Sequence, residues 1–367
     1  MDFDFSSDDR MVQEQVKRYL SEQCPITIHR SVMEGHSVQA IEVWQGLSEL
    51  GLQGTAISEA YSGVGAGYLP LCLVAQELGA VLAPVPFSSS IYLAAEAITL
   101  FGSEEQKEHY LPKLASGELI GTFAANEALV ETSTDKIDVV LNNSKIRGRK
   151  LVVPHGLVAD VAIVLVRSDS GPELVIVSLE GVARTPIEIV DPSIAAATLD
   201  FDGQPCEVLG VKGNGLERYQ TLIHRAAVLL AFEQIGGAEQ ALNMAVGYAK
   251  ERFAFGRPIG SFQALKHMMA DMYVALKLAE SNAFYAAWAL QNDAKDLALA
   301  AATARVSATQ AFQLCARDNI QVHGGMGFTW AFDCHLYYRR SNYLAVALGG
   351  SRVWENYLIN ALPGMAA

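Results

Sequence analysis

Residues 252–263 combine side chains and turn residues that could hold an anionic ligand. The segment contains Arg252 and Arg257 and ends in Gln263, with two glycines and a proline between them. A long helical pattern stops before this segment and another begins near Ser261, so the unpaired N–H groups of a helix start are expected here. Such N–H groups and arginine side chains both bind phosphate. The pattern predicts either a phosphate-binding turn or a plain connection between two helices with incidental arginines.

A second segment, residues 321–328, is rich in glycine. It reads Gln-Val-His-Gly-Gly-Met-Gly-Phe and follows another long helical pattern. A single glycine there would end the helix, whereas three close together indicate a backbone that something approaches closely. A loop of this kind can present a nest of N–H groups to an anion. Each segment alone is a weak signal, and the presence of both in one helical region strengthens the prediction of a bound anion.

Both segments resemble signature sequences of the acyl-CoA dehydrogenase family. The stretch RFAFGRPIGSFQ is similar to the elbow of that family, and QVHGGMGFTWAFDCHLYYRR is similar to its Gln-x-x-Gly-Gly segment and the residues after it. The stretch WQGLSELGLQGTAISEAYSGVGAG fits as well. The resemblance covers nearly the full length and implies an FAD cofactor, an acyl-CoA substrate and an oxidoreductase acting on CH–CH groups. It also implies a tetramer built from dimer pairs, with an electron-transfer flavoprotein as electron acceptor.

The resemblance assigns FAD contacts to both segments. In the family, the elbow reaches the adenosine diphosphate part of the FAD of the neighbouring subunit, and the glycine segment lies against the same FAD. The residues of this chain that match those contacts are Arg252, Phe255, Gln263, Gln321, Gly324 and Gly325. All are present, so the part of the site that serves a neighbour's cofactor is kept.

The part of the site that would serve the chain's own flavin ring departs from the family pattern. The family's Thr-Glu-Pro-Gly-x-Gly-Ser-Asp stretch corresponds to residues 124–131, where only Glu127 matches. A second flavin contact, Trp-Ile-Thr-Asn, corresponds to residues 152–155, which read Val-Val-Pro-His. The indole and the hydroxyl group are missing, and Pro154 has no backbone N–H to donate.

The catalytic base of the family is also missing from its usual place. Members remove a proton from the carbon next to the thioester while a hydride passes to the flavin, which requires a carboxylate. Most members carry this Glu directly before a Gly-Thr near the C-terminus, and Leu348 occupies that position here. Other members place the base on an earlier helix, where this chain has Ala226. No catalytic residue is therefore assigned, and Glu233 and Glu127 are poor candidates.

Four functions stay open from the sequence, one of them a flavin oxidase or monooxygenase on the same fold. The favoured one is a subunit of a heteromeric, α2β2 acyl-CoA dehydrogenase that clasps FAD shared with a catalytic paralogue. Similar heteromers act on steroid side-chain CoA thioesters, and this chain resembles them in the run Leu82–Phe87. This resemblance implies a role in lipid or steroid catabolism. The alternatives are a self-sufficient homotetrameric acyl-CoA dehydrogenase and a non-enzymatic oligomerisation partner that binds no flavin.

The elements that must position these segments follow the order helical, β, helical. Residues 1–117 show helical periodicity, and residues 118–208 hold short β-branched runs separated by turn residues, which predicts an antiparallel β-domain. Strands are expected at 137–141, 151–153, 161–166, 174–177, 187–190 and 199–201. The helical period returns over residues 209–367, with helices expected at 216–250, 262–291, 296–320 and 344–362. The predicted fold is α+β, mostly α, and resembles that of acyl-CoA dehydrogenases: an N-terminal helical domain, a middle β-barrel or sandwich domain and a C-terminal four-helix bundle.

Composition excludes several classes of protein. The chain has 367 residues, 51% of them hydrophobic, and a formal net charge of -13. Such an acidic chain without a long basic run is not expected to bind nucleic acid or an anionic membrane, and no apolar run reaches the ~20 residues of a transmembrane helix. The five cysteines are scattered, which predicts a reducing cytoplasm, and no metal-ligand spacing is found. The acidic N-terminus does not resemble an export signal.

Overall fold

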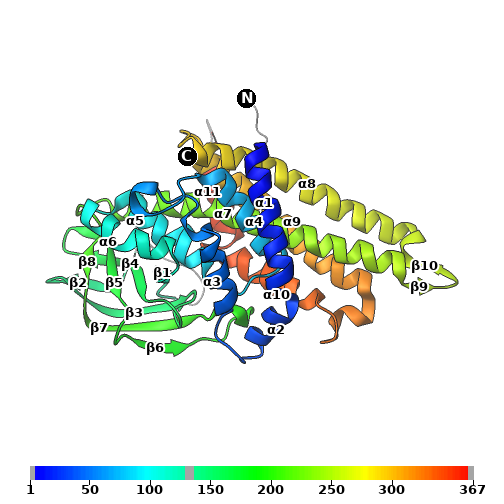
Figure 1. Cartoon of the computed structure of the whole chain (residues 1–367), viewed down its shortest axis with the longest axis horizontal. Helices are drawn as coiled ribbons and strands as arrows, with labels where there is room; N and C mark the ends of the chain where they lie inside the picture. The colour runs from blue at the N-terminus through cyan, green and yellow to red at the C-terminus, as the bar shows by residue number, and fades with distance from the viewer. Residues whose placement is uncertain (1–4, 129–135, 363–367) are drawn as a thin grey trace. The chain divides into compact units, whose positions relative to one another are not determined.

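The structure is a computed structural model, and it describes residues 5–128 and 136–362. The chain divides into two compact units, each built from separate parts of the sequence. The first, called here the helical unit, contains Met1–Thr27, Cys72–Ala83 and Ala227–Ala367. The second, the mixed unit, contains Ile28–Leu71 and Pro84–Ala226. Figure 1 labels the helices and strands of both. The predicted domain boundaries after residues 117 and 208 stay a prediction.

Short helices open the mixed unit. They are α3 (Ile41–Glu49), α5 (Glu96–Phe101) and α6 (Glu104–Ala115), with the π-helix η3 (Ser88–Ala95) before α5 and the 3₁₀ turns η1 (Leu52–Gly54) and η2 (Glu59–Tyr61) after α3. Ser103 and Gln106 form a capping box at the start of α6, a pattern of residues that is visible in the sequence.

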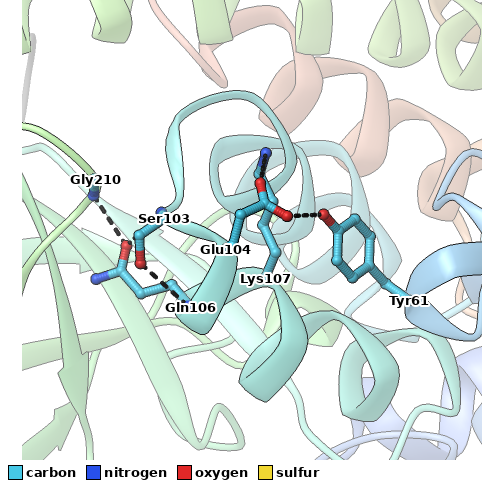
Figure 2. A network of polar contacts seen from close by, with 6 residues as sticks. All are labelled: Tyr61, Ser103, Glu104, Gln106, Lys107 and Gly210. Atoms are coloured by element: carbon cyan, nitrogen blue, oxygen red, sulfur yellow. Dashed lines mark hydrogen bonds and ion pairs between the residues drawn. The ribbon is translucent and has the colours of Figure 1, made fainter.

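The capping box also attaches the end of the sheet to α6. The Ser103 hydroxyl accepts a hydrogen bond from the Gln106 N–H at 3.2 Å, and the Gln106 side-chain oxygen accepts one from the Ser103 N–H at 3.1 Å. The same oxygen accepts a hydrogen bond from the Gly210 N–H at 2.9 Å (Figure 2). On the outer side of this turn, Tyr61 and Lys107 donate to the Glu104 carboxylate at 2.7 and 3.2 Å (Figure 2). Gln106 thus attaches the segment after the sheet to the start of α6.

One sheet carries the core of the mixed unit. Its strands are β1 (Gly121–Ala124), β2 (Val140–Asn142), β3 (Lys145–Val153), β4 (Val161–Ser168), β5 (Gly171–Ser178), β6 (Ala183–Pro186), β7 (Ala197–Pro205) and β8 (Glu207–Val208), with the 3₁₀ turn η4 (Pro192–Ile194) before β7. The order is β6-β7-β3-β2-β4-β5-β8, and β1 pairs with β4. Most neighbours are antiparallel, as predicted, but β1 and β2 both pair with β4 in parallel.

The strand predictions need correction: β6 and β8 were not predicted, β3 begins at Lys145 and not at residue 151, and two further differences have clear reasons. The run 187–190 is not a strand, because β6 ends at Pro186 and the residues after it are only partly buried. β1 was missed, since Gly-Thr-Phe-Ala contains a single β-branched residue and carries little strand preference. Its four residues are nevertheless all buried, so packing beside β4 decides its conformation.

Long helices form the helical unit. They are α1 (Ser7–Gln23), α7 (Gly215–Glu251, in this unit from Ala227 onward), α8 (Gln263–Gln291), α9 (Leu297–His323), α10 (Cys334–Val346) and α11 (Ser351–Ala361), with parts of α2 (Ile26–Met33) and α4 (Tyr68–Ala80). α7, α8 and α9 lie close to their predicted bounds. α10 was not predicted, and the helix expected at 344–362 is α11 alone.

Two glycines let α4 and α7 cross in close contact. A side chain at Gly79 would meet the Glu233 carbonyl oxygen at 2.0 Å, and one at Gly236 would meet the Gln76 carbonyl oxygen at 1.8 Å. A larger residue at either position would push the helices apart, since a packed interior has no room for it. The crossing fixes the middle of α7, from which Glu233 and Gln234 enter the interior of the unit.

The structure adds three observations that bear on the class of protein. None of the helices within residues 5–128 and 136–362 has the length and apolar character needed to cross a membrane. All five cysteines are free. In the same ranges, no group of His, Cys, Asp and Glu side chains is placed to hold a metal ion.

Candidate functional site

The segment between α7 and α8 contains a β-hairpin in the helical unit. β9 (Phe253–Ala254) and β10 (Arg257–Pro258) pair antiparallel, and Phe255 and Gly256 join them. Both joining residues have positive φ, 52° and 74°, as a two-residue type I′ turn requires. The 3₁₀ turn η5 (Ile259–Ser261) then leads into α8. The turn that the sequence predicts here is therefore a two-stranded β-hairpin that leads into α8.

Phe255 occupies the tip of this hairpin and faces water. Its side chain is 94% exposed. A non-glycine residue with positive φ costs about 1–2 kcal/mol, and exposure of an aromatic ring to water is unfavourable as well. Neither backbone preference nor solvation explains a phenylalanine at this position. An exposed aromatic side chain on a strained turn is typical of a contact with a ligand or a partner.

The two arginines of the hairpin have different environments. Arg252 is exposed, and its backbone carbonyl accepts a hydrogen bond from the Ile259 N–H at 2.8 Å, which closes the base of the hairpin. The Arg257 guanidinium lies over the Phe262 ring, 4.1 Å from its centroid. Arg252 therefore presents its charge to the outside, whereas Arg257 packs on an aromatic ring of its own chain.

The first turn of α8 offers N–H groups to an anion. Its N-cap is Phe262, whose side chain makes no capping hydrogen bond. The first N–H groups of the helix and the positive end of its dipole lie together here. Gln263, the first residue of α8, is exposed and adds a side-chain amide. This is the geometry that the sequence predicts for the start of this helix.

The glycines of the second segment have different roles. They lie in the 3₁₀ helix η6 (Gly324–Phe328), directly after α9. Gly324 has a φ of 59°, and a side chain at Gly324 or Gly325 would meet nothing within 4 Å. A side chain at Gly327 would meet the Ile320 carbonyl oxygen at 2.6 Å. Gly327 thus allows the segment to pack on α9, whereas the backbone at Gly324 and Gly325 lies open.

Tyr248 joins the two segments. It lies one helical turn before Arg252, and its ring stacks on the His323 ring with centroids 4.1 Å apart. His323 directly precedes Gly324, and its Nδ1 lies 2.8 Å from the Asn319 carbonyl oxygen. Burial lowers the pKa of His323, which favours the neutral ring in the stack. The stack holds the hairpin and the glycine segment close together.

All predicted FAD contacts are therefore collected on the helical unit, and nearly all face outward. The exposed members of this set, called below the exposed set, are Arg252, Phe255, Gln263, Gln321 and Gly325, together with the half-buried Gly324.

The usual position of the base carries a packing residue. Ala227, Ala302 and Trp354 form a buried cluster, and Leu348 packs against it. Leu348 has a φ of 60°, so it sits in a turn that L-residues rarely adopt. The alternative position, Ala226, is 0% exposed. Neither hydrocarbon side chain can take a proton.

A buried arginine holds the end of α10. Arg305 on α9 is 1% exposed and donates to the backbone carbonyls of Leu344 and Ala347, the latter at 2.8 Å. It also donates to the side chain of Gln234. Burial lowers the pKa of Arg305 to about 10, although Glu233 nearby favours the charged form. The carbonyls at the C-terminal end of a helix carry negative partial charge, which accommodates a buried cation.

The two carboxylates that could replace the base are already engaged. Glu233 pairs with Arg340 at 3.2 Å. In the mixed unit, Glu127 accepts hydrogen bonds from the Lys150 ammonium at 2.6 Å and from the Val139 N–H at 3.0 Å. Burial raises the pKa of Glu127, but the hydrogen bonds from Lys150 and the backbone outweigh it and lower the pKa overall. A base with a lowered pKa accepts a proton poorly.

Val153 and His155, two of the residues that match a flavin contact of the family, are buried in the mixed unit. The His155 Nδ1 lies 2.9 Å from the Ser89 hydroxyl, and His155 is 1% exposed. This ring therefore packs η3 against the end of β3 instead of facing a ligand. Of the other matching stretch, residues 124–131, the part 129–131 lies outside the described residues.

Sequence reasoning missed a buried ion cluster of the mixed unit. The Arg225 Nε donates to a Glu96 carboxylate oxygen at 2.5 Å, and the Tyr68 hydroxyl lies 2.9 Å from both Glu96 oxygens. The Arg225 guanidinium also lies 4.9 Å from the centroid of the Tyr68 ring. The three side chains come from distant parts of the sequence, so no local pattern reveals the cluster. The opposite charges of Arg225 and Glu96 compensate each other, so we assign the cluster a structural role in the interior of the mixed unit.

The chain matches the models of a known protein family and several curated proteins. The description "Acyl-CoA dehydrogenase, C-terminal domain" matches residues 213–361, and "Acyl-CoA dehydrogenase, N-terminal domain" matches residues 6–118. The chain is similar to acyl-CoA dehydrogenase IpdE2 of Mycobacterium tuberculosis, with 30% identity over 95% of this chain and 98% of that protein. It is 34% identical to acyl-CoA dehydrogenase FadE34 of the same species, over 88% of this chain but only 42% of FadE34.

A solved structure has the same fold. The chain is similar to a chain of the ChsE4-ChsE5 complex from Mycobacterium tuberculosis, with a TM-score of 0.90 and 27% identity, covering 100% of both chains. The predicted fold class, α+β and mostly α, is confirmed by this similarity and by the elements described above.

Proposed function

Because the chain belongs to the acyl-CoA dehydrogenase family, we propose that it is the FAD-clasping subunit of a heteromeric enzyme of that family. Members of the family are FAD-dependent oxidoreductases that act on the CH–CH group of an acyl-CoA thioester. In this proposal, two copies of the chain and two copies of a catalytic paralogue form an α2β2 complex. The paralogue surrounds the flavin ring and supplies the carboxylate that removes the substrate proton. This chain holds the adenosine diphosphate end of the same FAD.

One observation carries the proposal: the family's two groups of FAD-site positions differ in what their side chains face. In the exposed set, Arg252 and Phe255 point outward, and Phe255 does so on a strained turn. At the positions that would serve the chain's own flavin and substrate, Leu348 packs on a buried cluster and Glu127 is held by Lys150. Residues that serve a neighbour are therefore free to bind, and residues that would serve this chain are not.

The exposed set fits the nucleotide half of FAD. The Arg252 guanidinium and the first N–H groups of α8 suit two phosphates, and the Phe255 ring offers an apolar face for the adenine base. The open backbone at Gly324 and Gly325 allows a ligand to approach closely. FAD itself supplies the hydride-accepting flavin ring. Residues 152–155 do not fit that ring, so the work of this chain is to bind and orient the nucleotide end.

The relatives support a complex of unlike subunits. The structural relative is a complex of two different proteins, ChsE4 and ChsE5. By resemblance, the substrate is an acyl-CoA in lipid or steroid catabolism, and the electron acceptor is an electron-transfer flavoprotein. The cytoplasm is the proposed location.

Two other functions rank below this one. A self-sufficient homotetramer would need a base from this chain, yet Glu233 and Glu127 are each paired with a cation. A non-enzymatic partner could use the exposed Phe255 for a protein contact, but it would have no use for the exposed Arg252 or for the exposed Gln263 at the start of α8.

Flavin stoichiometry tests the proposal. The chain is purified alone and after co-expression with a catalytic paralogue, and visible flavin absorbance is measured per subunit. We expect a colourless chain alone and one FAD per pair of unlike subunits in the complex. A yellow chain with acyl-CoA dehydrogenase activity of its own would contradict the proposal and would support the self-sufficient homotetramer. A colourless complex would replace it by the non-enzymatic partner.

A further inference from the structure

One ring nitrogen beside the glycine segment has no role in the fold. His323 is 6% exposed, and its Nδ1 lies 2.8 Å from the Asn319 carbonyl oxygen. Among the residues that the structure describes, no group binds its other ring nitrogen, Nε2, and this atom is not enclosed by protein. A polar atom of a largely buried ring is expected to have a hydrogen-bond partner. Since the protein supplies none, the partner is water or a ligand.

The contacts of His323 define which nitrogen carries the proton. A carbonyl oxygen has no proton to give, so Nδ1 must carry the proton of the neutral ring and donate it to Asn319. Burial lowers the pKa of His323 by more than the hydrogen bond to the Asn319 backbone raises it, which keeps the ring neutral. Nε2 therefore has a lone pair and can only accept a hydrogen bond.

The orientation of the His323 ring is fixed before any ligand binds. The Tyr248 ring stacks on it with an interplanar angle of 22°, and the Phe332 ring meets it edge-on with centroids 5.7 Å apart. The hydrogen bond to Asn319 opposes rotation of the ring between these two neighbours. An acceptor that is already oriented loses little conformational entropy when it binds.

The surroundings of Nε2 suit an adenosine better than a phosphate or a metal ion. A phosphate oxygen offers only lone pairs, so it cannot donate to Nε2. A metal ion would need further ligands, and within residues 5–128 and 136–362 no group of His, Cys, Asp and Glu side chains is placed to supply them. A side chain at Gly324 or Gly325 would meet nothing within 4 Å, so a sugar or a base has room to approach. Adenosine carries uncharged hydroxyl and amino donors that match a neutral acceptor.

We propose that His323 is a further FAD contact and that its Nε2 accepts a hydrogen bond from the adenosine, either from a sugar hydroxyl or from the adenine amino group. This inference rests on the proposed function, since it assigns a residue to the nucleotide end of the same FAD. It also defines which way round that end lies. The adenosine donor meets the lone pair of Nε2, whereas the phosphates, which the lone pair repels, lie at Arg252 and the start of α8.

FAD analogues test this contact without any change to the protein. The apo-complex of the chain and the paralogue is titrated with FAD and with three analogues, which lack the 2′-hydroxyl of the adenosine, lack its 3′-hydroxyl, or carry oxygen in place of the adenine amino group. The analogue without the bonded donor should bind about 3- to 10-fold more weakly than FAD, which is the effect of one hydrogen bond. The weaker analogue identifies the donor. Equal binding of FAD and all the analogues would overturn the inference.

His323→Phe connects this difference in binding to the residue. The variant keeps a ring for the stack with Tyr248 but has no acceptor, so FAD should bind about 3- to 10-fold more weakly, and the difference between FAD and the analogue should disappear. His335→Phe is the matched control, since His335 stacks on the Trp330 ring in the same unit, and it should keep the difference. If His323→Phe keeps the difference as well, another residue binds the donor and the inference is wrong. Should the variant not assemble, the analogue titration of the unchanged complex still decides.

Flavin content separates this inference from the proposed function. A complex that stays colourless with FAD would contradict both. A complex that holds one FAD per pair of unlike subunits, but binds FAD and the analogues equally, would contradict only the contact at His323.

Discussion

Two groups of positions in this chain correspond to FAD-site positions of the family. Side chains of the exposed set face water, whereas those at the flavin-ring and base positions are packed or paired within the protein. Arg252 lies at the surface and presents its charge to water, whereas Glu127, one of the flavin-ring positions, is bound at 2.6 Å to Lys150, which is 0% exposed. Phe255 stays exposed on a strained turn, whereas His155 is buried against Ser89. A donor or acceptor that the protein already satisfies has little left for a ligand, because breaking a buried pair costs several kcal/mol. The contrast separates groups that can bind FAD from groups that hold the fold.

The largest effect is expected for Lys150→Met. The substitution leaves the Glu127 carboxylate without its cation and should lower the free energy of unfolding by about 3–5 kcal/mol. Flavin content of the folded complex should not change. Urea denaturation measures the first quantity and absorbance the second. Lys145→Met, on the same strand but exposed, is the control and should cost less than about 0.5 kcal/mol. Equal stability of both variants would show that Lys150 has no structural role.

Arg252→Ala should act in the opposite way. Loss of a charge-assisted contact to phosphate is expected to weaken FAD retention in the complex by about 1.5–3 kcal/mol, which is roughly 10- to 150-fold in Kd. The free energy of unfolding should stay within about 0.5 kcal/mol of the wild type. Fluorescence titration of the apo-complex with FAD gives the Kd. Lys250→Ala removes a nearby exposed charge and is the control. If Lys250→Ala weakens FAD retention equally, the effect comes from the loss of any nearby positive charge and not from a contact between Arg252 and phosphate.

Leu348→Ala should affect stability and leave catalysis almost unchanged. Truncation of a half-buried side chain that packs on the Trp354 cluster should cost about 1–2 kcal/mol of unfolding free energy. Turnover of the complex should stay within about twofold, a change that corresponds to less than ~0.5 kcal/mol. A steady-state assay of the complex with an acyl-CoA measures turnover. A tenfold drop at normal flavin content would mean that this chain's own pocket is used.

The smallest effect is expected for Phe255→Asn. Asn-Gly is a preferred pair for a type I′ turn, so the substitution should raise the free energy of unfolding of the chain alone by about 0.5–1 kcal/mol. The same substitution should weaken FAD retention in the complex. Thermal unfolding and FAD titration measure the two effects. Phe253→Asn, at an exposed position without positive φ, should not stabilise the chain. A loss of stability in Phe255→Asn would mean that the edge-on contact of its ring with Phe262, with centroids 6.2 Å apart, outweighs the relief of backbone strain.

Features with local causes were predictable from the sequence. The capping box at Ser103 marks the start of α6, and the helical period of α8 gives bounds that agree with the structure. α10 was missed because its sequence mixes apolar residues with Arg and Asn, and one of its arginines, Arg340, is buried against Glu233. A buried charge in a helix is read as exposed unless its partner on another helix is known.

By itself, the sequence determined which groups are present: the segments that resemble the family's FAD contacts, and the hydrocarbon side chains Leu348 and Ala226 where a carboxylate is required. Only the tertiary structure decided where the polar groups point. Glu127 and Lys150 are 23 residues apart, and Glu96 and Arg225 are 129 apart. Whether such groups are exposed or paired depends on which segments pack against each other, because burial and opposite charge act through space and not along the chain.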